Sequence, residues 1–189
     1  MSIKADVQLD AKGLACPMPI VKTRKAMNSL ADGQILEVQA TDKGSLADLK
    51  AWCESVGHQY IGTIDENDVY LHYIRKSSNE EKEEKTFDKT INNDELIQRA
   101  SNGALILDVR EEAEYAFGHI EGSKSIPLGE LEDRLQELDK TQEILVICRT
   151  GTRSDLAAQK LAEKGFTNVF NVLPGLNSWN GELSKKYHI

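Results

Sequence analysis

The chain has 189 residues, 40% hydrophobic and 29% charged, which is ordinary for one large or two small soluble domains. Its formal net charge is −8, with −3 in residues 1–74 and −5 in residues 88–189, so neither half has the positive excess of a nucleic-acid-binding domain. No apolar run approaches the roughly 20 residues that cross a bilayer, and the N-terminus does not resemble a secretory signal. We therefore expect a cytoplasmic protein that binds neither nucleic acid nor membrane.

Residues 1–74 are predicted to form a two-layer α/β sandwich with the element order β-α-β-α-β-β, in which two helices cover a four-stranded sheet. The expected elements are a strand at 7–9, a helix that begins near Pro17, a strand at 35–40, a helix that ends at Gly57, and strands at 59–65 and 69–73. A tight turn at Glu66-Asn67 is expected to join the last two strands.

Residues 75–87 separate the two halves, and between Arg75 and Thr86 they include no apolar side chain. Such a segment cannot contribute to a core, so we expect a flexible, solvated linker with a mean reach of about 20 Å. A short charged helix is the alternative, because Glu81 and Lys85 are spaced to pair along a helix.

Residues 88–189 alternate strands with helices, which predicts a parallel sheet covered by helices on both faces. We expect strands at 104–109, 143–147 and 169–172, and helices at 94–100, 111–117, 128–138 and 154–164. Gly103 and Gly165 are the expected stop signals of the first and last of these helices.

Cys148 follows the expected strand at 143–147 and precedes a short loop and a helix. The loop N–H groups, the helix N-terminus and the charges of Arg149 and Arg153 would all favour a thiolate over a thiol. A thiolate here would be a nucleophile, and the loop would hold an anionic substrate. A packed core cysteine is one rival interpretation, and a phosphatase is another. Cysteine phosphatases use the spacing C-x5-R, whereas this chain has C-x4-R, a shorter ring that favours sulfur transfer.

Residues 88–189 resemble a single-domain rhodanese. Besides the Cys148 loop, the matching motifs are Leu107-Asp-Val-Arg110-Glu, Gly118-His-Ile-Glu-Gly122, Ser125-Ile-Pro-Leu128 and Pro174-Gly-Leu-Asn-Ser-Trp179. The resemblance implies a five-stranded parallel sheet and transfer of sulfane sulfur through a persulfide on Cys148. It implies a substrate cradle made of Arg149, Thr150, Gly151, Thr152 and Arg153. We interpret Asp108, Arg110 and His119 as structural, and Trp179 as a packing residue.

Cys16 precedes a helix that starts with a proline, in the sequence Leu14-Ala-Cys16-Pro-Met-Pro19. The N–H groups of the first helical turn would favour a thiolate there, which suggests an exposed, activated thiol on a rigid platform. From these few residues alone, a packed cysteine is equally compatible. Residues 3–74 resemble the TusA/SirA-like family, from Asp10-Ala-Lys-Gly-Leu-Ala-Cys16-Pro-Met-Pro19 to Cys53 and Gly57-His58. The resemblance implies that Cys16 carries sulfur as a persulfide, without a bound cofactor.

The third cysteine, Cys53, lies on the apolar stripe of the second expected helix, so we expect a buried, inert thiol. That stripe comprises Leu46, Leu49, Cys53 and Val56, and Ser45 is the expected cap of the helix. Three widely spaced cysteines without a C-x-x-C pair form neither a disulfide framework nor a metal site.

The sequence thus predicts a sulfurtransferase in which Cys148 takes sulfur from a small donor and relays it to Cys16 for delivery to a protein acceptor. Thiosulfate and glutathione-, bacillithiol- or CoA-type persulfides are the expected donors. A persulfide-responsive interaction protein with little turnover is the alternative. tRNA thiolation, sulfide detoxification and cofactor assembly all remain compatible with the sequence.

Overall fold

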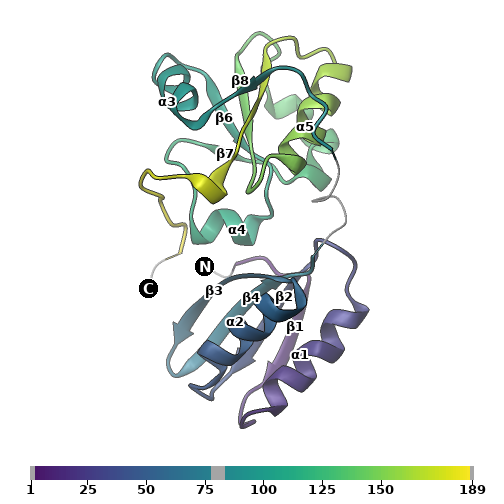
Figure 1. Ribbon diagram of the computed structural model, residues 1–189, viewed down its shortest axis with the longest axis vertical. Coiled ribbons are helices and arrows are strands. Elements are labelled where there is room, and N and C mark those ends of the chain that lie inside the picture. Colours follow the sequence, from purple (N-terminus) through teal and green to yellow (C-terminus); the bar gives the residue numbers. More distant parts are fainter. Residues whose placement is uncertain (1–2, 78–83, 188–189) are drawn as a thin grey trace. The chain divides into compact units, whose positions relative to one another are not determined.

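The structure, a computed structural model, describes residues 3–77 and 84–187, and the chain divides into two compact units (Figure 1). The first unit comprises Met1–Asn79 with Tyr187–Ile189, and the second comprises Glu80–Lys186. Much of the expected linker at 75–87 lies outside the described residues, including Glu81 of the alternative charged helix. Of its described ends, Arg75 belongs to a strand and Phe87 packs against the core of the second unit.

The first unit has the predicted order β-α-β-α-β-β. Its elements are β1 (Val7–Ala11), α1 (Met18–Ser29), β2 (Ile35–Ala40), α2 (Ser45–Val56), β3 (Gln59–Glu66) and β4 (Val69–Arg75). The sheet order is β1-β2-β4-β3; β1 and β2 run parallel, whereas β4 is antiparallel to both of its neighbours. The two-residue turn between β3 and β4 is Asn67-Asp68, one position later than predicted, and both residues have positive φ angles of 53° and 67°. This geometry is typical of a tight hairpin turn.

Both helices of the first unit pack on the same core. Met27 from α1, Leu49 and Cys53 from α2, and Leu36 and Ile74 from the sheet belong to one buried cluster. The apolar stripe of α2 is buried only in its middle, because Leu46 and Val56, near the helix ends, are 40% and 48% exposed. Gly57 ends α2 in the left-handed conformation with φ 84°, as the sequence predicts.

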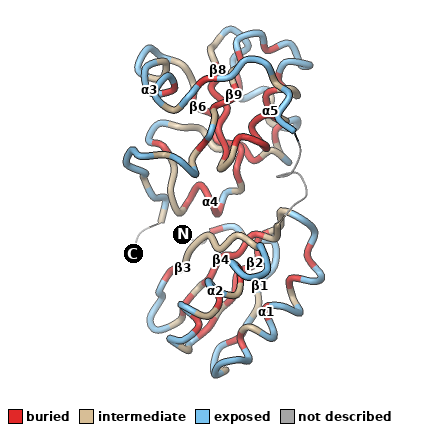
Figure 2. The backbone as a smooth tube through the Cα atoms, in the orientation of Figure 1, coloured by how far each residue is buried: buried red, intermediate tan, exposed pale blue. Residues whose placement is uncertain are grey.

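The second unit contains the predicted parallel sheet. Its strands are β5 (Thr90–Ile91), β6 (Leu105–Asp108), β7 (Lys124–Ser125), β8 (Ile144–Ile147) and β9 (Val169–Val172), in the order β5-β9-β8-β6-β7. The α-helices are α3 (Asn93–Ser101), α4 (Glu112–Phe117) and α5 (Thr152–Glu163). Figure 2 shows that buried residues gather on the central strands, where every residue of β8 is buried. A strand buried on both faces explains the continuous apolar run in its sequence.

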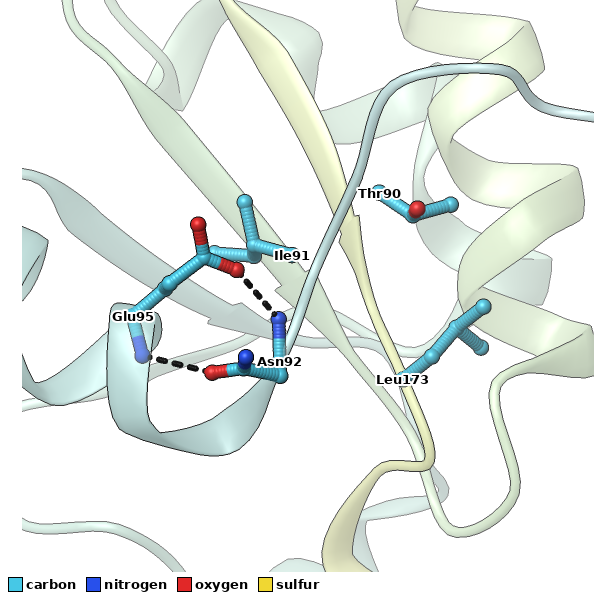
Figure 3. A pocket seen from close by; sticks show the side chains of 5 residues that line it. All are labelled: Thr90, Ile91, Asn92, Glu95 and Leu173. Carbon is cyan, nitrogen blue, oxygen red and sulfur yellow. Dashed lines mark hydrogen bonds between the residues drawn. The ribbon is translucent and has the colours of Figure 1, made fainter.

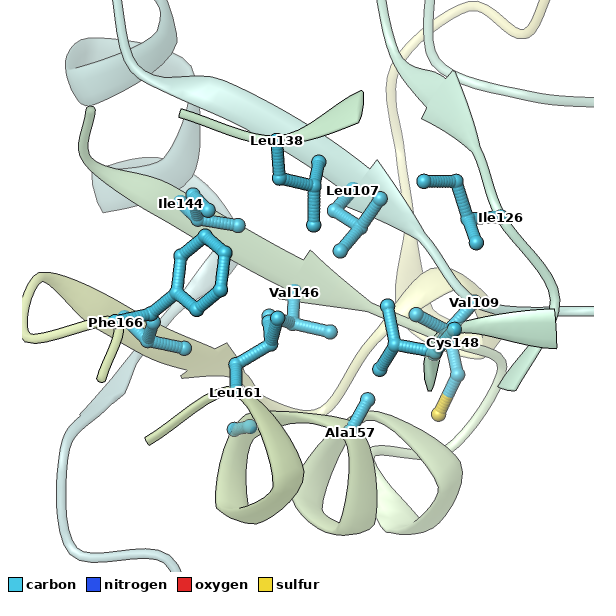
Figure 4. Packing of buried hydrophobic residues seen from close by; sticks show 13 residues of the cluster. Leu107, Val109, Ile126, Leu138, Ile144, Val146, Cys148, Ala157, Leu161 and Phe166 are labelled. Carbon is cyan, nitrogen blue, oxygen red and sulfur yellow. The ribbon is translucent and has the colours of Figure 1, made fainter. Parts of the chain in front are cut away.

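Alternate residues of β8 face two different cores. Ile144 and Val146 pack with Leu161 of α5, as Figure 4 shows, whereas Leu145 and Ile147 belong to a cluster with Leu96 of α3. Helices therefore cover both faces of the sheet, and Cys148 emerges from its best-buried strand.

The predicted helix at 128–138 is wrong. This stretch forms two short 3-10 helices, η2 (Leu128–Glu130) and η3 (Glu132–Glu137). Its apolar spacing resembles a helical pattern because Leu131 and Leu138 are both buried in the core. Gly129 disfavours the α-helical conformation at the start of the stretch.

Candidate active site

Cys148 lies at the carboxyl end of β8, beside Val109 and Ala157 (Figure 4). The chain turns into α5 through Gly151, which has a φ angle of 92° that favours glycine. A Cβ atom on Gly151 would lie 2.2 Å from Cδ2 of Leu173, so any larger residue would force this loop apart.

The loop is also held from the segment after β9. The N–H of Leu176 donates to the Cys148 carbonyl at 2.9 Å, and the N–H of Asn177 donates to the Arg149 carbonyl at 2.8 Å. Gly175 allows this close approach, since a Cβ atom there would lie 2.6 Å from the same Cys148 carbonyl oxygen. The backbone around the cysteine is therefore fixed by contacts from two sides.

The sulfur of Cys148 receives two backbone hydrogen bonds. The N–H of Gly151 donates to Sγ at 3.1 Å, and the N–H of Ser154 donates at 3.4 Å. The Ser154 hydroxyl oxygen lies 3.3 Å from the same sulfur. Donors at the start of a helix stabilise negative charge. The structure thus brings the predicted nucleophile and the predicted loop N–H groups together, with Cys148 itself buried.

Arg153 was expected to form part of the substrate cradle, but its guanidinium does not face an open site. Its guanidinium forms a buried bidentate pair with Glu114 of α4, at 2.6 Å from Nη1 to Oε2 and 3.0 Å from Nη2 to Oε1. Burial alone would lower the pKa of Arg153, but the charge and hydrogen bonds of Glu114 and the nearby Cys148 raise it. Arg153 therefore stays charged near the sulfur, but its hydrogen bonds are committed to Glu114.

The other members of the predicted cradle have different positions. Thr152 is buried in the first turn of α5, whereas Arg149 and Thr150 are partly exposed at the loop. Thr152 therefore lies where it supports the helix start, and Arg149 and Thr150 form the accessible part of the loop.

Sequence reasoning missed Glu114 and Asn171. The Ser154 hydroxyl donates to Oδ1 of Asn171 at 2.6 Å, and Nδ2 of Asn171 donates to the Gly151 carbonyl at 3.2 Å. Asn171 therefore bonds to both Gly151 and Ser154, the two residues whose N–H groups donate to Sγ of Cys148. Its signal in the sequence was an amide within the apolar strand at 169–172. Glu114 gave no distinct signal, because it is one of three glutamates within four residues.

A shallow pocket of about 270 Å³ adjoins the loop through Leu173. Its other lining residues are Thr90, Ile91, Asn92 and Glu95 (Figure 3). Asn92 and Glu95 cap α3 reciprocally: the Asn92 side chain accepts from the Glu95 N–H, and the Glu95 carboxylate accepts from the Asn92 N–H, both at 2.9 Å. These polar groups are engaged with each other, so we assign no chemistry to this pocket.

Cys16 is exposed and lies just before α1 (Met18–Ser29), whose N-cap is Pro17. Its N–H donates to Oδ2 of Asp42 at 3.3 Å. A hydrogen bond with Asp48 raises the pKa of the Cys16 thiol, and partial desolvation and the charges of Asp48 and Asp42 raise it further. The expectation of an activated thiolate is therefore wrong in sign. The sequence shows that Cys16 lies at a helix N-terminus, which favours a thiolate. It does not show that the carboxylates of Asp42 and Asp48 lie beside Cys16, because only the fold brings them there.

Asp42 is anchored to a buried polar network. Its backbone carbonyl accepts from the Ser45 hydroxyl at 2.6 Å, and that hydroxyl lies 3.0 Å from Nε2 of His72. Tyr60 completes the network, with its hydroxyl 2.7 Å from Nδ1 of His72. Burial lowers the pKa of His72 to about 4, so its imidazole is neutral at neutral pH. Ser45 is therefore not the cap of α2, as predicted, but a link between the core and the segment beside Cys16.

Cys53 has the predicted environment. It is fully buried, and burial, followed by the charge of Glu54, raises the pKa of its thiol to about 12. Across residues 3–77 and 84–187, no cluster of three or more His, Cys, Asp or Glu side chains could hold a metal ion. No helix within the described ranges is both long enough and apolar enough to span a membrane.

Two family models match the chain in succession. Residues 7–76 match the model described as Sulfurtransferase TusA, and residues 92–182 match the model described as Rhodanese-like domain. The boundary between the two matches falls between the two compact units.

Relatives share one or both parts. YrkF of Bacillus subtilis strain 168, whose name describes a sulfur carrier protein, is 48% identical over 182 residues, which cover 95% of this chain and 98% of YrkF. YrkI of the same strain, also named for a sulfur carrier, is 60% identical over 74 residues, or 39% of this chain and 99% of YrkI. A solved rhodanese-like domain protein from Staphylococcus aureus is 31% identical, with a TM-score of 0.49, over 52% of this chain and 99% of that one.

Proposed function

The chain belongs to the family in which a TusA-type sulfur-carrier domain is followed by a rhodanese-like domain, and from this membership we propose a sulfur relay between two thiols. The family makes it a sulfurtransferase in the broad sense. In the proposed relay, Cys148 takes sulfane sulfur from a small donor, and Cys16 then carries that sulfur to a protein acceptor.

In the first step, the Cys148 thiolate attacks the outer sulfur of the donor. With thiosulfate, an S–S bond forms to Sγ, the S–S bond of the donor breaks, and sulfite leaves with the electron pair. With a glutathione, bacillithiol or CoA persulfide, the leaving group is the corresponding thiolate. Either exchange leaves a persulfide on Cys148 and conserves electrons, so the step requires neither an oxidant nor a bound cofactor.

One observation carries this assignment. The N–H groups of Gly151 and Ser154 both point at Sγ of Cys148, where they would stabilise the attacking thiolate and then the anionic persulfide. Asn171 holds both donors in place through the Gly151 carbonyl and the Ser154 hydroxyl. A core cysteine at a strand end requires no such arrangement.

In the second step, the Cys16 thiolate attacks the outer sulfur of the Cys148 persulfide. A new S–S bond forms to Cys16, the bond to Sγ of Cys148 breaks, and the Cys148 thiolate leaves. Because the pKa of Cys16 is raised, its thiolate fraction at neutral pH is small, and we expect this step to accelerate as the pH increases.

The same observation at Cys16 favours a second function. A protonated thiol is a poor nucleophile, so the chain could accumulate one stoichiometric persulfide and act as a persulfide-responsive interaction protein. Steady-state transfer of sulfur to cyanide separates the two functions. Repeated turnover supports the sulfurtransferase, whereas a single modification without turnover supports the interaction protein.

Mass spectrometry of each cysteine after treatment with donor tests the relay. We expect the wild-type chain to gain sulfur on both Cys148 and Cys16, and a Cys148→Ser variant to gain none on Cys16. Cys53→Ala is the matched control, because it removes a thiol that is buried away from the proposed chemistry. Equal loading of Cys16 in the Cys148→Ser variant would disprove the relay.

Mixing two variants that each lack one thiol of the relay shows whether sulfur passes between chains. Cys148→Ser supplies only the carrier thiol, and Cys16→Ser supplies only the receiving thiol. Sulfur on Cys16 of the mixture would show transfer between molecules. We place the exchange in the cytoplasm, where thiols stay reduced, with a downstream protein as acceptor and no direct role for nucleic acid.

A further inference from the structure

The described end of the expected linker is fixed to the second unit. The N–H of Phe87 donates to Oδ1 of Asp155 at 3.0 Å, and Nε2 of Gln159 donates to the Thr86 hydroxyl at 2.9 Å. The Phe87 side chain packs against the hydrophobic cluster that includes Cys148. Residues 85–87 therefore lie along α5 and do not behave as the free coil that their composition predicts.

This docking brings Lys85 to the Cys148 loop. A Cβ atom built on Gly151 would lie 3.5 Å from Cε and 3.6 Å from Nζ of Lys85. Gly151 is also the residue whose N–H donates to Sγ at 3.1 Å. The distances to Nζ and to Sγ, joined through the Cβ, Cα and N positions of Gly151 with standard bond lengths, set an upper limit. Nζ of Lys85 lies no more than about 9 Å from Sγ of Cys148.

The charge of Lys85 is available to a ligand. The Lys85 side chain is exposed, and among the residues that the structure describes no carboxylate forms a salt bridge with it. Arg153, by contrast, has its guanidinium bound by Glu114. The loop therefore depends less on Arg153 for binding an anion than its sequence suggests.

We propose that Lys85 is a specificity-determining residue that binds the anionic end of the sulfur donor while Cys148 attacks the sulfane sulfur. This inference rests on the proposed function of Cys148. A sulfur under attack stands about 3–3.5 Å from its nucleophile, and a donor S–S bond adds about 2 Å. The charged group of thiosulfate thus lies roughly 5–7 Å from Sγ, a range that falls inside the limit of about 9 Å on the distance from Sγ to the ammonium nitrogen.

Steady-state kinetics of a Lys85→Gln variant with two donors test the proposal. With thiosulfate as donor and cyanide as acceptor, we expect kcat/KM to fall about two- to fivefold through KM, as for loss of one exposed ion pair. With the persulfide of mercaptoethanol, whose far end is a neutral hydroxyl group, we expect no change. Lys85→Arg keeps the charge and is expected to retain most of the thiosulfate activity.

Lys89→Gln is the matched control. Lys89 belongs to the same segment and is also exposed, but its Nζ donates to the Thr167 carbonyl at 3.0 Å. We expect this variant to behave as the wild type with both donors. Equal losses with both donors in Lys85→Gln, or a fall in kcat alone, would assign Lys85 a structural role and overturn the proposal.

A binding experiment separates this inference from the function on which it rests. In a Cys148→Ser background, calorimetric titration with thiosulfate measures the affinity of the site without turnover. We expect Lys85→Gln to weaken that affinity by the same factor as KM. If the wild type turns over donor and Lys85→Gln binds thiosulfate unchanged, the role of Lys85 is wrong and that of Cys148 stands. If thiosulfate binding depends on Lys85 but no donor modifies Cys148, the proposed function fails instead.

Discussion

Arg153 of α5 and Glu114 of α4 form a buried ion pair through two parallel hydrogen bonds. Only 3% of the Arg153 side chain and 1% of the Glu114 side chain are exposed, so neither charge can be satisfied by water. Because Arg153 immediately precedes Ser154, whose N–H contacts Sγ of Cys148, the pair fixes the start of α5 relative to the sulfur.

Replacing Glu114 by Gln leaves the Arg153 charge buried without its counter-ion. We expect this change to lower the free energy of unfolding by about 3–5 kcal/mol, measured by urea denaturation. Glu137→Gln is the control, because it breaks an ion pair with Arg134 in which both side chains are about one-third exposed. That pair is screened by solvent, so its loss should matter far less. Similar losses in the two variants would contradict the role assigned to burial.

Gly151→Ala should disrupt the loop around Cys148. The added Cβ atom meets Leu173, and the φ angle of 92° is unfavourable for alanine. We expect a loss of stability above the roughly 1–3 kcal/mol of backbone strain alone, together with slower persulfide formation in a single turnover. Gly122→Ala separates the two causes, because Gly122 also has a positive φ angle, 77°, but open space around it. Equal effects at both positions would mean that the contact with Leu173 is unimportant.

Asp48→Asn should make Cys16 more reactive. Asp48 is the largest cause of the raised pKa of Cys16, so its removal lowers that pKa and increases the thiolate fraction near pH 7.5. We expect the rate of iodoacetamide alkylation at Cys16 to rise several-fold, with the midpoint of its pH profile shifted to lower pH. Asp68→Asn, in the turn after β3, removes an equal charge that does not act on Cys16 and should leave the profile unchanged. An unshifted midpoint in Asp48→Asn would show that this carboxylate does not control the thiol.

His72 should make the first unit sensitive to acid. Burial lowers the pKa of His72 from 6.5 to about 4, so between these values the unfolded chain binds more protons than the folded one. Stability therefore falls as the pH drops through this window, by about 3 kcal/mol when the whole window has been crossed. Denaturant titrations at pH 7 and pH 4.5 should show a smaller difference for His72→Gln than for the wild type. The same difference in both proteins would remove His72 as the cause.

The element order of the first unit and the position of Cys148 in the second were predictable because they depend on local patterns. An apolar run such as 144–147, followed by a glycine that allows a left-handed turn, specifies a buried strand, a loop and a helix without reference to the rest of the chain. The same holds for Cys53, whose burial follows from its place among apolar residues.

The electrostatics of both cysteines could not be predicted, because they depend on residues distant in sequence. Glu114 neutralises Arg153 from 39 positions away, and Asp42 reaches the N–H of Cys16 from 26 positions away. A prediction from the helix N-terminus considers only the N–H donors that are close in sequence. It omits the carboxylates that the fold brings close to the cysteine. The error was largest at Cys16, where the sign of the effect reversed.

The carboxylates beside Cys16 also bear on oxidative damage. Peroxides attack the thiolate and not the thiol, so a surface cysteine held in its protonated form is oxidised slowly to a sulfenic acid. Asp42 and Asp48 therefore slow the oxidation of an exposed thiol that lacks the protection complete burial gives Cys53.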